Sequence, residues 1–178
     1  LTWLWYGKKP QRKLKTELNN RLENHRLKRI ALTLFYLGLL TFSMQKEGKR
    51  FQIQVLDVGQ GDGIYLCTSD GISMFFDGGS SSVSGVGTYR ILPFLKAKGV
   101  RRIDYWFVSH TDADHINGLE EILQLDYPIG TVVFPEYGYR DASLEKLEEE
   151  IERNGIMICY LKAKESLRTK NDRITCIF

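Results

Sequence analysis

The sequence predicts an α/β domain built in layers, preceded by a separate basic and apolar segment. From residue 51 onward, short apolar runs typical of strands come first and then alternate with helical patterns. This order of elements is typical of layered α/β domains. Gly-rich turns separate the runs. The composition, 43% hydrophobic and 26% charged, is that of a folded chain and excludes general disorder.

The elements can be placed from their periodicity and their end signals. Apolar runs bounded by Gly, Asp and Ser predict strands over 51–56, 64–67, 72–76, 103–109, 131–134, 156–161 and 173–178. Helical spacing predicts helices over 89–98, 116–125 and 144–154. We expect Pro93 near the start of the first helix and Ser143 as the cap of the last. Gly99 and Gly155 should close the first and last helices.

Residues 1–44 differ in composition from the rest. Residues 7–29 hold nine Lys or Arg against two Glu, which predicts a basic loop facing acidic lipid or nucleic acid. Residues 30–44 carry no charge and are rich in Leu and aromatic residues, which favours a transmembrane helix. The stretch is shorter than the roughly 20 residues of a usual span, so a buried or interfacial helix is the alternative.

The charge distribution also predicts an orientation. Residues 1–6 are apolar, so residues 7–29 would connect two membrane segments. The positive-inside rule puts such a loop in the cytoplasm. The domain over residues 45–178 is then expected at the cell membrane, on its extracytoplasmic side.

A cluster of metal-ligand side chains follows the most apolar strand, in the segment His110-Thr-Asp-Ala-Asp-His115. At strand spacing, His110 and Asp112 point the same way and can reach one metal ion. Asp114 and His115 follow in the turn and can reach a second. Imidazole and carboxylate groups suit zinc, manganese or iron. An acidic helix N-terminus would also explain the two Asp, but two His and two Asp at this spacing favour a metal site.

This segment resembles the His-x-His-x-Asp-His signature of the metallo-β-lactamase superfamily, with Asp112 where the second His usually stands. The segments 55–62 (Val-Leu-Asp-Val-Gly-Gln-Gly-Asp), 75–79 (Phe-Phe-Asp-Gly-Gly) and 91–99 narrow the match. They come in the order seen in the carboxy-terminal domain of ComEC-type DNA-internalisation competence proteins. The resemblance covers about residues 50–178. It implies the amino-terminal half of a metallo-β-lactamase-like hydrolase domain, a partial αββα sandwich, after a membrane-proximal helical segment.

The resemblance also implies a cofactor and ligands. Two divalent ions, zinc or manganese, are expected in the complete domain, with Asp114 also orienting the nucleophile. The extra carboxylate at position 112 favours harder ions such as manganese. The expected metal ligands are His110, Asp112, Asp114 and His115.

Other acidic residues have weaker expectations. By resemblance, Asp57 and Asp62 lie near the metal site, and Asp57 is expected to orient the ligands. Asp77 either does the same or stabilises the turn at the end of its strand. Asp172 is a weaker candidate ligand, because it stands just before the last predicted strand, where a third metal-binding motif falls in the family. No His follows His115 in the sequence, so the remaining ligands are expected beyond residue 178. We therefore expect this chain by itself to be inactive as a hydrolase.

The function implied by the resemblance is DNA uptake. The parent protein would form a channel for DNA, and this domain would hydrolyse DNA phosphodiester bonds. Its partners would be DNA, the membrane through residues 30–44, and other competence proteins. Two alternatives remain open because one fold hosts many chemistries. The first is another cell-surface phosphodiesterase or esterase of the superfamily, and the second is a non-catalytic module that binds DNA or gates its passage.

Overall fold

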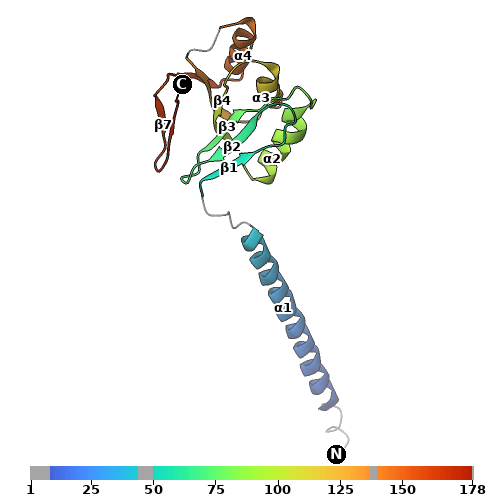
Figure 1. The fold of residues 1–178 in the computed structure, drawn as a ribbon. Coiled ribbons are helices and arrows are strands. Elements are labelled where there is room, and N and C mark those ends of the chain that lie inside the picture. Colours follow the sequence, from blue (N-terminus) through green and yellow to red (C-terminus); the bar gives the residue numbers. More distant parts are fainter. Residues whose placement is uncertain (1–8, 44–49, 137–139, 178) are drawn as a thin grey trace, which may run out of the picture. The chain divides into compact units, whose positions relative to one another are not determined.

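The computed structural model describes residues 9–43, 50–136 and 140–177. The chain divides into two compact units, Leu1–Glu47 and Gly48–Phe178. In the first unit the structure describes a single helix, α1 (Lys9–Ser43). The second unit holds the sheets and the remaining helices (Figure 1).

Helix α1 corrects two expectations. The basic stretch predicted as a loop is helical from Lys9, because residues 11–37 contain no Gly or Pro and many straight-chain residues that favour helix. The second expectation was a transmembrane helix over 30–44. Among the helices that the structure describes, none is long and apolar enough to cross a membrane. Charged residues up to Arg29 occupy the first part of α1. Residues 1–6 and position 44 lie outside the described residues.

The second unit is built on a six-stranded sheet in the order β1-β2-β3-β4-β5-β6. Neighbours among the first three strands run antiparallel, whereas β3, β4, β5 and β6 run parallel. The strands are β1 (Gln52–Val55), β2 (Gly63–Cys67), β3 (Ser73–Asp77), β4 (Ile103–Phe107), β5 (Ile129–Pro135) and β6 (Met157–Leu161). The α/β class predicted from the sequence is confirmed.

One face of this sheet forms the hydrophobic core with three helices, α2 (Leu92–Ala97), α3 (Ala113–Gln124) and α4 (Ala142–Arg153). The rings of Phe75 and Trp106 stack at its centre, 4.6 Å apart, and both side chains are fully buried. The apolar face of α3 is the one predicted: Ile116, Leu119, Ile122 and Leu123 are all buried. The helices are therefore fixed to the sheet by burial of apolar area.

The opposite face of the sheet is also apolar: Met74 and Val133 are buried there, whereas Phe76 and Phe107 are partly exposed. Phe76 and Phe107 stack there with ring centroids 4.5 Å apart. A second sheet, the hairpin of β7 (Ser166–Arg168) and β8 (Arg173–Thr175), lies beside this face. Its Leu167 lines the same hollow as Tyr105 and Phe107. Helices on one face and a second sheet on the other agree with the expected partial αββα sandwich.

Several element boundaries differ from those predicted. A π-helical turn over Gly87–Ile91 precedes α2, and α3 begins at Ala113 instead of residue 116. The cap of α4 is Asp141, whose carboxylate accepts a hydrogen bond from the Leu144 amide at 2.8 Å, and not Ser143. Both residue types cap helices well, so periodicity could not decide between them. Strand β7 is too short to give an alternating pattern and was not predicted.

Close backbone contacts bring two loops against α3. A Cβ atom on Gly79 would overlap the backbone of Asp114, and one on Gly61 would overlap both the Gly79 carbonyl and the Asp114 carbonyl. A Cβ on Gly118, within α3, would overlap the carbonyl oxygen of Gly78. Only glycine permits this approach, and it places the loop before β2 and the loop after β3 beside the amino-terminal part of α3.

Gly118→Ala should therefore destabilise the second unit, because the clash is with backbone that cannot turn away. Overpacking of this kind costs about 1–3 kcal/mol or more, which corresponds to a fall in melting temperature of roughly 5–10 °C. The matched control is Gly38→Ala in α1, where a Cβ meets nothing within 4 Å. Circular dichroism melts should show the fall for Gly118→Ala only; equal melts would contradict the packing described.

Candidate metal centre

The residues of the predicted site meet at the edge of the sheet where β3 and β4 end. These strands are parallel neighbours, so their carboxyl ends share an edge, the usual place for ligand sites in α/β sheets. Asp77 is the last residue of β3, and residues 109–112 follow β4. His115 lies in the first turn of α3, and Asp62 lies just before β2.

The Asp77 side chain connects the ends of the two strands. Its carboxylate accepts hydrogen bonds from the Ser109 amide at 2.7 Å and from the Ser109 hydroxyl at 3.0 Å. Its backbone carbonyl accepts a bond from the Trp106 indole at 2.7 Å. Asp77 has a φ of 55°, a left-handed conformation that Asp tolerates better than most residues but that is costly. These bonds hold the strained residue in place.

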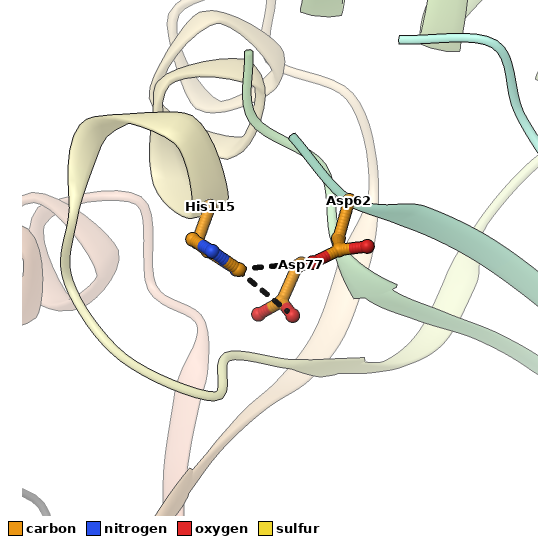
Figure 2. A group of neighbouring side chains, drawn as sticks. All are labelled: Asp62, Asp77 and His115. Atoms are coloured by element: carbon orange, nitrogen blue, oxygen red, sulfur yellow. Dashed lines mark ion pairs between the residues drawn. The ribbon is translucent and has the colours of Figure 1, made fainter. Parts of the chain in front are cut away.

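His115 is held by two carboxylates (Figure 2). Its Nδ1 lies 3.2 Å from a carboxylate oxygen of Asp77 and 3.9 Å from one of Asp62. The side chains of His115 and Asp77 are only 14% and 13% exposed, whereas Asp62 is 62% exposed. His115 and Asp77 therefore form a mostly buried pair, and the carboxylate of Asp62 beside them is open to solvent.

His110 lies beside His115, with ring centroids 3.8 Å apart. The Ser109 hydroxyl is 2.9 Å from His110 Nδ1 and 3.4 Å from His115 Nδ1. His110 Nε2 lies 3.5 Å from an Asp112 carboxylate oxygen. This agrees with the expectation that positions 110 and 112 point the same way. Asp112 is 79% exposed, so this side of the site is open.

Ligand atoms of Asp62, Asp77 and His115 lie within 4.8 Å of one another, close enough to surround one ion. The hydrogen bonds favour a different role for Asp77. Its carboxylate already accepts two bonds from Ser109 and faces His115 Nδ1. A metal-bound His commonly donates its second ring N–H to such a carboxylate. Both His rings are contacted through Nδ1, by Ser109 and, for His115, also by Asp77, so a metal ion would have to bind them through Nε2.

The other predicted site residues are placed differently. Asp114 lies in the first turn of α3, half-buried and outside the group formed by Asp62, Asp77 and His115. Asp112 occupies the N-cap position of α3, but its side chain makes no capping hydrogen bond. That leaves its carboxylate available for a ligand.

Two further acidic residues have hydrogen-bond partners other than the two His. The Asp57 carboxylate accepts a long bond, 3.3 Å, from the Gly59 amide within its own loop. The Asp172 carboxylate accepts bonds from the Ser69 amide and hydroxyl, both at 2.8 Å. Ser69 follows β2 at the end opposite Gly63, so Asp172 fastens the β7–β8 hairpin to the β2–β3 turn and is not brought to the site.

Two residues that support the site escaped the sequence reasoning. Ser109 joins Asp77 to both His rings, as described above. The Asn117 side chain accepts a bond from the Ser80 amide at 2.9 Å and donates one to the Ser80 carbonyl at 2.7 Å. This bidentate pair holds the loop after β3 against α3. Ser and Asn are ordinary at strand and helix ends, so only the contacts reveal their role.

The donor set fits divalent metal ions. Imidazole nitrogens and carboxylate oxygens are ligands for zinc and manganese. Asp62, Asp77 and Asp112 place three carboxylates beside the two His. Like charges gathered this closely repel one another, and bound cations relieve that repulsion.

Comparison with known proteins agrees with the motifs. No family model matches the chain. It is 26% identical to ComE operon protein 3 of Bacillus subtilis (strain 168) over 155 residues, 80% of this chain and 20% of that protein. It is 26% identical to competence protein ComA of Neisseria gonorrhoeae over 70% of this chain and 17% of that protein. The resemblance to ComEC-type competence proteins is confirmed.

A third relative is recombination protein 2 of Haemophilus influenzae, 32% identical over 119 residues, 64% of this chain and 15% of that protein. The chain thus spans a fifth or less of the length of these relatives. Solved structures of similar architecture include CmlA, a diiron β-hydroxylase from Streptomyces venezuelae, 17% identical over 72% of this chain and 24% of that one (TM-score 0.44). Another is a metallo-β-lactamase from Hirschia baltica, 14% identical over 68% and 57% of the two chains (TM-score 0.37).

Ser109→Ala should lower the affinity for zinc or manganese, because it frees both His rings from their common partner. Loss of such a supporting bond commonly costs 10–100-fold in metal affinity. Ser84→Ala, an exposed serine in the loop before the π-helical turn, is the matched control. Isothermal titration of the full chain measures both. Unchanged affinity in Ser109→Ala would show that the hydroxyl does not orient the ligands.

Proposed function

We propose that this chain is part of a competence protein for DNA uptake, and that its second unit is a metal-dependent hydrolase domain acting on DNA phosphodiester bonds. The observation that carries the proposal is the hydrogen bonding of the two His rings. Ser109 contacts the Nδ1 atoms of both rings, and Asp77 contacts that of His115, beside the open carboxylate of Asp112. The names of the relatives, which refer to competence and recombination, support the DNA substrate.

The proposed ligand roles are those that the sequence motif indicates. His110 and Asp112 would hold one ion, and Asp114 and His115 a second. When bound, divalent ions stabilise negative charge on a phosphate and lower the pKa of water. Asp77 would keep the His115 ring in the tautomer that offers Nε2. Asp114 would orient the attacking water and accept its proton.

The negative charge of the site determines how DNA can bind there. DNA carries one negative charge per phosphate, and the site presents several carboxylates, two of them largely exposed at 62% for Asp62 and 79% for Asp112. Without cations this edge of the sheet repels DNA. Binding of DNA at this site should therefore require a divalent metal. The proposal also includes contact with other competence proteins and an extracytoplasmic position at the cell membrane.

His115→Ala should abolish metal-dependent DNA binding, because it removes a proposed ligand and the imidazole that lies beside the Asp77 and Asp62 carboxylates. We expect manganese affinity of the full chain to fall by roughly 100-fold or more, and anisotropy of a labelled single strand to lose its manganese dependence. Asp172→Asn is the matched control, because that carboxylate bonds Ser69 away from the site.

The result also separates the alternatives. DNA binding that needs no metal and weakens steeply with salt favours the non-catalytic module. Metal binding without any DNA binding favours another phosphodiesterase or esterase. An equal loss in Asp172→Asn and His115→Ala would show that the site has been placed wrongly.

Asp112→His should change the metal preference. The substitution restores the usual superfamily signature and replaces a hard oxygen ligand with an imidazole, which favours zinc over manganese. We expect the ratio of zinc to manganese affinity to rise on the order of tenfold, as measured by competition titration. A ratio that does not move would mean that residue 112 is not a ligand.

A further inference from the structure

A small pocket opens directly beside the proposed metal ligands. It has a volume of about 170 Å³, and His110 and Asp112 form one of its sides. Thr111, Asp141 and the end of β5 form the others. The volume is below the ~300–1,000 Å³ of pockets for drug-sized ligands, so it suits a single ring system.

The walls of the pocket differ in character. Phe134, Pro135 and Leu144 supply an apolar wall. Phe134 and Leu144 are almost completely buried in the core, at 3% and 4% exposure, so this wall is rigid. A flat apolar ring can contact it without displacing any charged group. The other wall carries a hydroxyl donor, Thr111, and a carboxylate acceptor, Asp141.

The hydrogen bonding between Thr111 and Asp141 is weak. The Thr111 hydroxyl lies 3.3 and 3.4 Å from the two Asp141 oxygens, long for an O–H···O bond. One Asp141 oxygen is committed to the Leu144 amide at 2.8 Å. The second oxygen can accept a hydrogen bond from a ligand N–H at little cost. The Thr111 hydroxyl can then turn to donate to the ligand.

Resting on the proposed function, we infer that this pocket binds one unpaired nucleobase next to the phosphate held at the metal centre. Every base presents an N–H donor beside a ring or carbonyl acceptor on its Watson–Crick edge, which matches the carboxylate of Asp141 and the hydroxyl of Thr111. In a duplex that edge is already paired. The pocket therefore favours single-stranded over double-stranded DNA, as other sites that read unstacked bases do.

The test compares two ligands that share the phosphate and differ in the base: deoxycytidine 5′-phosphate and deoxyribose 5-phosphate. Their affinities for the full chain with zinc are measured by NMR titration. The base should add about 5-fold to 30-fold in affinity, the worth of one or two hydrogen bonds and an apolar contact. Asp141→Asn and Thr111→Val should each lower this ratio at least about threefold, with the affinity for deoxyribose 5-phosphate unchanged.

Asp141→Asn is chosen because Asn caps helices as well as Asp does, so α4 should keep its cap; equal melting temperatures check this. Amide shifts at residues 111 and 141, seen only with the deoxycytidine ligand, give a second measurement that needs no variant. A ratio near 1 in the unsubstituted chain, or one that both variants leave unchanged, overturns the base pocket while the metal centre stands. If neither ligand binds in the presence of zinc, the base pocket and the proposed function fall together.

Discussion

The carboxylate of Asp77 holds together the parts on which the site depends. It ends β3, accepts both hydrogen bonds from Ser109 at the end of the neighbouring strand, and pairs with His115 on α3. Each of these three segments also belongs to the hydrophobic core or directly follows a core strand. The position of the two His rings is therefore coupled to the packing of the sheet, and a shift of either strand would move both imidazoles.

This coupling needs close backbone approach, which glycine supplies. The loop after β3 and the loop before β2 both approach the backbone of the first turn of α3 so closely that Gly79 and Gly61 leave no room for a Cβ. The bidentate pair between Asn117 and Ser80 then fixes the loop after β3 to the helix. The strained φ of Asp77 is stable here because its neighbours over-determine it.

The two sides of the site differ in exposure to solvent. The buried side holds the Asp77–His115 pair, and the open side presents Asp62 and Asp112. A pocket with an apolar wall and a donor–acceptor pair lies next to the open side. Anionic substrates need cations to approach such carboxylates. A nucleotide satisfies both features, because its phosphate would meet the metals and its base would meet the pocket wall.

The sequence by itself determined the layered α/β class and the apolar face of α3, and it singled out the segment from His110 to His115 as the candidate for metal ligands. Those features are local: periodicity reports which face is buried, and four residues of metal-ligating type within six positions can be recognised without any distant partner. It did not determine that residues 9–29 continue as one helix, that Asp141 caps α4, or that Asp172 bonds Ser69. The sequence placed Asp62 and Asp77 near the site by resemblance alone; only the tertiary structure decided that they contact His115 and that Ser109 contacts both His. Along the chain, 32 residues separate Asp77 from Ser109. Parallel pairing of β3 and β4 brings these residues together, and no local pattern encodes that contact.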